Sequence, residues 1–281
     1  MAHLLFLIPL LPFIGFIAWT LWMVRQSSRG RSPLTSKLLR PPGHSLALKL
    51  EVTQERFFIR MALAAALAGG SGALASIPGS WSIIALLAVA LVELGLLIHL
   101  RFLLIQVRAQ RRGLLGEQAV GETLAALQAK GCHVFHDLVH ENGEGSFNID
   151  HIIVGPQGVF AVETKYRQKP TAKGGTDWKV EARAHTLHFP TGVDHASIPQ
   201  AERQAQWLAG FLRKATAEPV KVHPILTLPG WWINVRERNG VPVLNEKQIA
   251  GFVLQSPRIL RDEQVQRIAH QLEQRCRDVE V

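Results

Sequence analysis

The chain has 281 residues, with 31 Lys and Arg against 22 Asp and Glu and a formal net charge of +9. This length is enough for one sizeable domain and additional segments. The two cysteines, Cys132 and Cys276, exclude a disulfide framework and a four-cysteine zinc site. The sequence holds no P-loop, dinucleotide-binding fingerprint or ordered Ser-His-Asp set, so none of these motifs points to a function.

The positive charge is concentrated in the first part of the chain. Residues 25–60 hold eight Lys and Arg and two Glu, and residues 101–112 hold four Arg and no acid. Residues 113–281 hold 19 basic and 19 acidic residues and are therefore neutral. Because both basic stretches adjoin apolar segments, we expect the excess charge to set membrane topology instead of forming a nucleic-acid surface.

Apolar stretches predict three transmembrane helices, at about residues 4–24, 57–77 and 81–100. The first is 21 residues long and carries no charge, which is enough to cross a bilayer. A cleaved signal peptide is the alternative, but Met1-Ala2-His3 lacks the usual basic start of such a peptide. The turn at Pro78-Gly79-Ser80 predicts that the second and third segments form a helical hairpin.

The basic flanks predict the orientation. Since the loop at 25–56 and the flank at 101–112 are both basic, both should be cytoplasmic. The prediction is a multi-pass protein of the inner or plasma membrane, in contact with the lipid bilayer, with an external N-terminus and a cytoplasmic C-terminal domain. Ser27 to Ser45 is rich in Ser, Pro, Gly and basic residues and is predicted to be a flexible loop.

The remaining chain alternates helix and strand patterns. Gly113 and Gly116 are expected to end the third membrane helix, and a new helix is expected from Glu117 to Lys130. Next come a strand at 132–139 and two apolar strands joined at Gly155-Pro156-Gln157-Gly158. The later predicted elements are a strand at 186–189, a helix at 199–215, strands at 222–228 and 241–244, a helix from Asn245 to Gln255 and a charged helix at 261–277.

Three ionisable residues stand in the otherwise apolar hairpin: Asp150, Glu163 and Lys165. Side chains alternate faces along a strand, so Glu163 and Lys165 should point to the same side. Pairing of the two strands around their turn would place Asp150 beside Glu163. Two close carboxylates repel each other, and a hard divalent cation relieves that repulsion. The alternative is a buried salt bridge between Lys165 and one of the acids.

These residues resemble a known family. Asp150 with Glu163-Thr164-Lys165 resembles the PD-(D/E)xK nuclease signature, and the wider context is similar to its nuclease-related domain branch, NERD. The matching pieces are Gly113 to Glu117, Ile149-Asp150-His151, Gly158-Val159-Phe160 and Glu163 to Tyr166, within roughly residues 113–255. The chain departs from the pattern at Ile198-Pro199-Gln200, where the family's Asn-Pro pair before its glutamine helix is not intact.

The resemblance implies an α/β fold, a restriction-endonuclease-like mixed sheet flanked by helices. This domain, at 113–255, would follow the three-helix membrane region at 1–112 and precede a C-terminal helical extension at 256–281. The implied activity is Mg²⁺-dependent or Mn²⁺-dependent hydrolysis of nucleic acid, DNA more than RNA. The implied roles are metal binding by Asp150, Glu163 and the Thr164 carbonyl, water or phosphate positioning by Lys165, and support from Glu117 and Gln200. Without the resemblance, Glu117 would be explained better by the dipole of its helix.

Two further points stay open in the sequence. Arg167, Lys169 and Lys173 follow the site and are predicted to contact a nucleic-acid backbone, although a solvated loop would have the same composition. The alternative function is a non-catalytic, membrane-tethered module on the same fold that binds nucleic acid or protein. The neutral charge of residues 113–281 favours the module, and the complete Asp, Glu and Lys set favours the nuclease.

Overall fold

A computed structural model describes residues 22, 37–75, 79–142, 145–169, 178–237 and 240–279. The chain divides into two compact units. The first, here called the helical unit, includes Leu50–Arg108, and the second, the sheet unit, comprises Ser36–Lys49 and Ala109–Glu280. Except for Trp22, the first predicted membrane span lies outside the described residues, as does Lys173.

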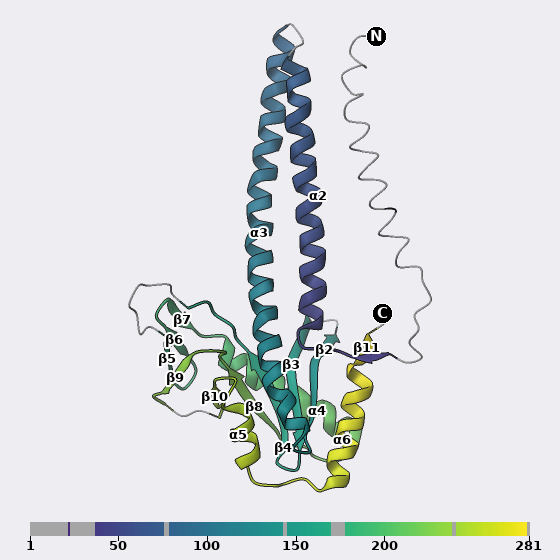
Figure 1. The fold of residues 1–281 in the computed structure, drawn as a ribbon, viewed down its shortest axis with the longest axis vertical. Helices are drawn as coiled ribbons and strands as arrows, with labels where there is room; N and C mark the ends of the chain where they lie inside the picture. Colours follow the sequence, from purple (N-terminus) through teal and green to yellow (C-terminus); the bar gives the residue numbers. More distant parts are fainter. Residues whose placement is uncertain are drawn as a thin grey trace. The chain divides into compact units, whose positions relative to one another are not determined.

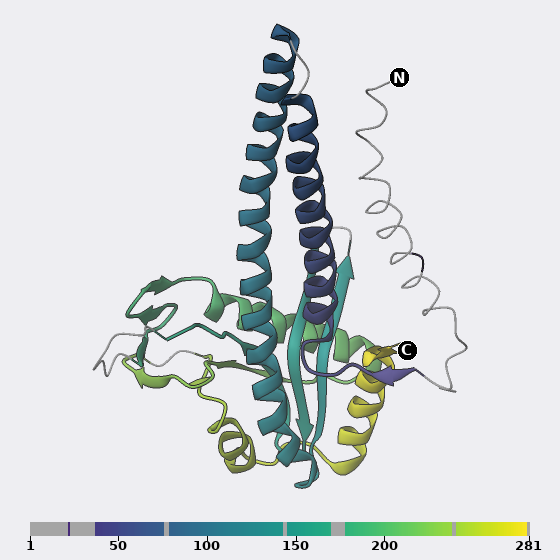
Figure 2. The same cartoon turned by 45° about the horizontal axis from the view of Figure 1, so that its top comes forward.

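The helical unit consists of parts of two long helices, α2 (His44–Ala75) and α3 (Ser80–Gln128), which lie side by side there (Figures 1 and 2). Among the described residues, α3 alone is long and apolar enough to span a membrane. The prediction of three such helices is therefore wrong for this part of the chain. In α2 the apolar stretch between Arg60 and the helix end at Ala75 is shorter than the roughly 20 residues of a typical span.

The glycines expected to break the third helix lie inside it. Helix α3 continues through Gly113 and Gly116, so the predicted break and the separate helix from Glu117 are wrong. A Cβ atom on Gly116 would lie 2.5 Å from Cβ of Tyr166, and one on Gly113 would lie 2.9 Å from Cδ2 of Leu46. These glycines therefore allow neighbouring chain segments to approach α3 closely, and packing compensates their low helix propensity.

A five-stranded mixed sheet forms the centre of the sheet unit, in the order β10-β8-β4-β3-β2. Strands β2 (His133–Asn142), β3 (Gly145–Gly155) and β4 (Gly158–Thr164) pair antiparallel in sequence order. Strand β8 (Val222–Thr227) joins β4 in parallel, and β10 (Val243–Leu244) joins β8 in parallel. Gly158 closes the β3–β4 turn with a φ of 125°, which an L side chain rarely adopts.

Helices cover both faces of this sheet, which confirms the predicted mixed α/β class. On one face, α4 (Ser197–Thr216) packs mainly against β4 and β8, and α6 (Asp262–Cys276) packs against β2 and β3, in a core that includes Leu208 and Leu272. On the other face, the end of α3 and helix α5 (Ile249–Gln255) pack against β3, β4 and β8 in a core that includes Leu124. Helix α5 begins four residues after Asn245, whose side chain instead accepts the N–H of Lys247 in a preceding turn.

A second, four-stranded sheet has the order β7-β6-β5-β9. It comprises β5 (Lys179–Ala182), β6 (Leu187–Phe189), β7 (Gly192–Asp194) and β9 (Trp232–Val235). Its core includes Trp231, which is 1% exposed, whereas the adjacent Trp232 is 70% exposed. Of these strands the sequence predicted only β6, within the expected strand at 186–189.

The end of the predicted flexible loop is part of the sheet unit. Strand β1 (Leu38–Leu39) pairs with β11 (Arg277–Val279), and α2 begins at His44. Pro42 lies so close to α3 that a Cβ atom on Gly121 would be 2.3 Å from its Cγ. Residues 37–45 therefore pack against the rest of the sheet unit instead of forming a loose loop.

Candidate active site

Three buried carboxylates from different elements lie close together in the sheet unit. Glu117 comes from α3, Asp150 from β3 and Glu163 from β4, and they are 7%, 6% and 4% exposed. The register of the hairpin pairs His151 with Val162, which places Asp150 next to Glu163 as the sequence predicted. Buried carboxylates are rare unless they are paired or bind a cation, so this cluster requires an explanation.

Hydrogen bonds hold two of the three carboxylates. Oδ2 of Asp150 accepts the backbone N–H of Thr164 at 2.7 Å. Oε1 and Oε2 of Glu163 accept the side-chain amides of Gln200 and Gln204, each at 2.7 Å. By contrast, Oε2 of Glu117 is buried and has no hydrogen-bond partner in the described part of the chain. The cluster therefore retains an uncompensated acceptor.

The electrostatics of the cluster favour a bound cation. Burial raises the pKa of Glu117 to about 8, and repulsion by Asp137 and Glu163 adds to the effect. The pKa of Asp150 lies well above its usual range because of burial, then because of Glu163 and Glu117. These groups repel one another when ionised, and a divalent cation among them would lower all of their pKa values.

The pKa of Glu163 is raised less than that of Glu117, for two reasons. Burial raises its pKa to about 7, while the hydrogen bond from Gln204 and the charge of Lys165 act in the opposite direction. The effect of Lys165 is that of a positive charge near the Glu163 carboxylate. The backbone N–H of Lys165 donates to the carbonyl of Thr227 at 2.9 Å, which fixes the chain just beyond β4.

The donor set fits a hard divalent cation in its chemistry. Carboxylate oxygens are the preferred protein ligands of Mg²⁺, which usually keeps several waters and takes one or two carboxylates. Each oxygen of Glu163 has two lone pairs, so a hydrogen bond from a glutamine leaves one available. Among the described residues, no group of three or more His, Cys, Asp or Glu side chains is already arranged to hold a metal ion. Binding would therefore involve side-chain adjustment, for which the unpaired Glu117 oxygen is the obvious candidate.

One glutamine of the site was not selected from the sequence. Gln200 was predicted to support the site, but Gln204 also bonds Glu163 and is only 2% exposed. The sequence did indicate Gln204, because residues four positions apart share one face of a helix and both positions are glutamines. The departure at Pro199-Gln200 does not displace Gln200 from the site, since its amide bonds Glu163 directly.

The residues predicted to contact nucleic acid have intramolecular partners. The guanidinium of Arg167 forms an ion pair with Asp194 at 2.9 Å and lies 4.4 Å from the ring centre of Phe189. The ammonium of Lys169 lies 4.5 Å from the ring centre of Trp178. Nucleic-acid contact stays a prediction for both, but replacing Arg167 would also loosen the small sheet.

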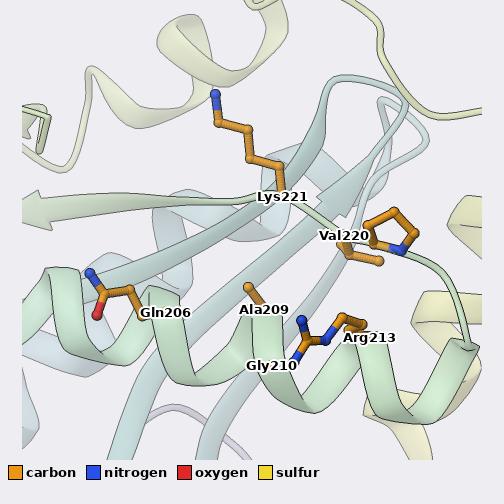
Figure 3. A pocket seen from close by; sticks show the side chains of 7 residues that line it. Gln206, Ala209, Gly210, Arg213, Val220 and Lys221 are labelled. Atoms are coloured by element: carbon orange, nitrogen blue, oxygen red, sulfur yellow. The ribbon is translucent and has the colours of Figure 1, made fainter.

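A groove on the sheet unit is separate from the carboxylate cluster. It has a volume of about 550 Å³ and lies between the C-terminal half of α4 and the chain entering β8 (Figure 3). Its lining residues are Gln206, Ala209, Gly210, Arg213, Pro219, Val220 and Lys221, with no carboxylate or histidine among them. The groove therefore has no carboxylate or imidazole that could bind a metal ion.

Comparison with known proteins identifies one domain. Residues 112–229 match the family model of the nuclease-related domain, NERD. The matched stretch contains all three carboxylates, Lys165 and both glutamines of the cluster. No curated protein and no solved structure matches the chain.

The raised acid pKa values predict how stability depends on pH. Without metal, the free energy of unfolding should fall as the pH rises from 6.5 towards 8. Glu117 has a pKa of about 8 in the folded protein and 4.5 in the unfolded chain, so the folded state holds a proton that the unfolded state has released. The resulting stability is fully present below pH 4.5 and is lost as the pH approaches 8.

Two histidines, His136 and His151, act against this trend at the lower end of the window. Burial lowers the pKa of His136 from 6.5 to about 4, and burial with repulsion from His136 lowers that of His151. Both are neutral in the folded state, and their unfolded forms, with a pKa of 6.5, lose most of their remaining protons by about pH 7.5, so the decline should be clearest above that pH. Urea unfolding in chelator, followed by tryptophan fluorescence, measures the trend, and Glu117→Gln should flatten it. Stability that increases over this range would contradict the assignment of buried, repelling acids.

Proposed function

We propose that the nuclease-related domain hydrolyses phosphodiester bonds of nucleic acid, with Mg²⁺ or Mn²⁺ held by Asp150, Glu163 and the carbonyl of Thr164. One observation carries the proposal: three buried carboxylates converge beside a lysine, and one of their oxygens has no partner. A purely structural cluster would be expected to satisfy that oxygen, because an unpaired buried acceptor destabilises the fold.

Each protein group has a defined task in the proposed reaction. When bound, the metal ion would supply an activated water and stabilise charge on the phosphate. The Thr164 N–H fixes the orientation of Asp150, and Gln200 and Gln204 fix that of Glu163. The Lys165 ammonium, close to Glu163, would hold a phosphate oxygen or orient the attacking water.

The proposed substrate is nucleic acid, DNA more than RNA. The excess charge of the chain lies outside residues 113–281, which are neutral. Binding would therefore depend on a small number of phosphate contacts near the site, such as Lys169. A small number of contacts gives a weak dependence of affinity on salt concentration, since each phosphate neutralised adds about 0.7–0.9 to the logarithmic slope.

A non-catalytic binding module is the second candidate. It is favoured by the two glutamines that occupy both oxygens of Glu163 and by the neutral charge of the domain. In such a module the acids would be protonated at neutral pH and the site would need no metal. The nuclease proposal and the module proposal therefore differ in their requirement for a divalent cation.

Cleavage by the purified full chain tests the proposed function. In detergent, the wild-type protein should cut a fluorescent single-stranded or duplex DNA when Mg²⁺ or Mn²⁺ is present and should stop cutting in chelator. RNA of the same sequence should be cut more slowly. Binding of these oligonucleotides without cleavage in either metal would decide for the module. If the protein neither binds nor cleaves nucleic acid, the nuclease proposal is wrong and the module could only be one that binds protein.

We also propose that the chain is anchored in a membrane through α3, with the sheet unit in the cytoplasm. The apolar part of α3 precedes the basic stretch 101–112, and basic stretches flank the cytoplasmic side of spans.

Reporter fusions test this topology. A reporter fused after Val281 should be active in the cytoplasm, and one inserted at Gly79, next to the start of α3, should be active outside. The physical reason is the four arginines at 101–112, which resist translocation. Replacing these arginines with neutral residues is the control and should weaken the asymmetry. External activity of the C-terminal fusion would overturn the proposed orientation.

A further inference from the structure

A continuous set of hydrogen bonds runs from the first turn of α2 to the Glu163 carboxylate. Its members are Ser45, Asp137, Asn148, Gln204 and Glu163. Three of its side chains are almost fully buried: Asp137 is 0% exposed, Gln204 2% and Glu163 4%. None of the first three residues was selected from the sequence as part of the site, and Ser45 is 92 positions from Asp137.

Asp137 is the junction of this network. Its Oδ2 accepts the N–H of Ser45 at 2.7 Å and the hydroxyl of Ser45 at 2.5 Å, and its Oδ1 accepts the side-chain amide of Asn148 at 2.8 Å. Its carbonyl also accepts the Arg40 guanidinium at 2.7 Å. Asp137 has a φ of 53°, which is uncommon for a residue other than glycine. Such a conformation persists only where surrounding contacts hold it.

The contact with Ser45 fixes the first turn of α2 to the sheet. The N–H groups in the first turn of a helix have no partner within the helix. Here a carboxylate from β2 supplies that partner, and a negative charge at a helix N-terminus is also favourable electrostatically. Asp137 therefore determines where α2 starts relative to β2.

The contact with Asn148 extends this restraint to the site. The carbonyl of Asn148 accepts Nε2 of Gln204 at 2.9 Å, and the same Nε2 donates to Oε2 of Glu163 at 2.7 Å. A glutamine amide has only two hydrogens, so these two bonds use both. The direction in which Gln204 holds Glu163 is thus set by the position of the Asn148 backbone, which Asp137 holds through the Asn148 side chain.

We propose that Asp137 is a positioning residue for the metal site, and that it makes the first turn of α2 part of the scaffold that places Glu163. The inference rests on the proposed function, because it concerns how tightly Glu163 and Asp150 bind a divalent cation. Asp137 is not assigned as a ligand: three donors already occupy its carboxylate oxygens. Residues that orient metal ligands typically change metal affinity by about 10–100-fold when replaced.

The test compares Mn²⁺ affinity, measured by electron paramagnetic resonance on the full chain in detergent, among matched variants. Asp137→Asn should weaken Mn²⁺ binding by about 10-fold. The reason is that the carboxylate accepts from Ser45 and Asn148 at once, whereas the uncharged amide can keep both contacts only if the side-chain amide of Asn148 turns over. The double variant Asp137→Asn/Asn148→Asp reverses the direction of the bond between positions 137 and 148 and keeps an acceptor towards Ser45. It should recover most of the affinity at unchanged net charge.

A serine pair supplies the control for general destabilisation. Ser45→Ala removes one donor to Asp137 and should weaken Mn²⁺ binding by a smaller factor than Asp137→Asn. Ser256→Ala removes a hydroxyl that donates to the Phe252 carbonyl at 2.9 Å, in a helix end away from the network. Ser256→Ala should leave Mn²⁺ affinity unchanged. Melting temperatures of all variants separate loss of folding from loss of metal affinity.

The outcomes distinguish the inference from the function on which it rests. If the wild-type protein binds Mn²⁺ and cleaves DNA but Asp137→Asn binds Mn²⁺ equally well, the positioning role is wrong and the nuclease proposal stands. If Asp137→Asn is weakened and the double variant is not restored, the charge of Asp137 matters and its geometry does not, which also overturns the inference. If the wild-type protein binds no divalent cation, the proposed function itself is wrong.

Discussion

Lys165→Ala is expected to abolish cleavage while leaving metal binding intact. The Lys165 ammonium lies near Glu163 and lowers its pKa, but a cation does not coordinate a metal ion. Its predicted task is to act on charge that develops at the phosphate in the transition state. Removing one such donor typically lowers turnover by about 10²–10³-fold. Turnover of a labelled DNA and Mn²⁺ affinity, measured on the same preparation, check the two halves of the prediction.

Lys179→Ala is the matched control for this substitution. Lys179 is an exposed lysine on β5, in the second sheet, and lies outside the carboxylate cluster. Its replacement should change turnover little and reduce nucleic-acid affinity slightly, as loss of a surface charge does. Equal effects of the two substitutions would show that Lys165 contributes only general positive charge. Retained cleavage in Lys165→Ala would remove the lysine from the mechanism.

The central hairpin could be predicted from the sequence because the residues that determine it are close together in the chain. Val, Ile and Phe fill the two strands, and the Gly-Pro-Gln-Gly turn joins them, so the register follows from chain geometry. That register alone brings Asp150 next to Glu163, and the structure confirms the neighbourhood. The alternation of side chains along the strand also predicts that Lys165 points to the same side as Glu163.

The glycines in α3 are a case in which helix propensity gave the wrong prediction. Gly113 and Gly116 are poor helix residues, so the sequence predicted a helix boundary there. Their actual neighbours, Leu46 and Tyr166, are about 50–70 positions distant in the chain. A requirement for close approach between such distant segments cannot be recognised from helix propensity.

The hydrogen-bond network of Asp137 could not be predicted from the sequence either, because its members are far apart in the chain. Asp137 stands in a strand pattern where an isolated acid usually marks an exposed position, yet it is fully buried. Its partner Ser45 lies in a stretch whose composition indicates a flexible loop. Only the folded arrangement, in which α2 begins at the sheet unit, brings the two residues together.

The buried acids have opposite effects on stability and on function. In the absence of metal, ionised carboxylates in this cluster repel one another, as the raised pKa values of Glu117 and Asp150 show. The same repulsion would strengthen the binding of a divalent cation, because the cation would neutralise it. Binding to the folded state alone then stabilises the protein. A site of this kind should therefore be unstable when empty and stable when filled.

Asp150→Asn tests this relation and should raise the melting temperature of the metal-free protein while abolishing its stabilisation by Mg²⁺. The amide oxygen can still accept the Thr164 N–H, so the substitution removes charge and keeps the hydrogen bond. The effect should grow as the pH rises through about 8, the pKa of Glu117, because ionisation increases the repulsion; the expected rise is about 2–4 °C for each kcal/mol of repulsion removed. Glu163→Gln should lose Mg²⁺ binding as well.

Asp194→Asn is the control with the opposite expected sign. Asp194 is buried to a similar degree, at 7% exposure. Although burial raises its pKa, hydrogen bonds from the backbone of Ser197 and Ala196, and from the side chains of Ser197 and Arg167, lower it overall. Its ionised form therefore stabilises the fold above its unfolded pKa of 3.8, and its replacement should lower the melting temperature. If Asp150→Asn and Asp194→Asn destabilise the metal-free protein equally, Asp150 belongs to an ordinary buried hydrogen-bond network. Stabilisation by Asp150→Asn, together with loss of the Mg²⁺ effect, would identify a carboxylate kept for the cation it binds.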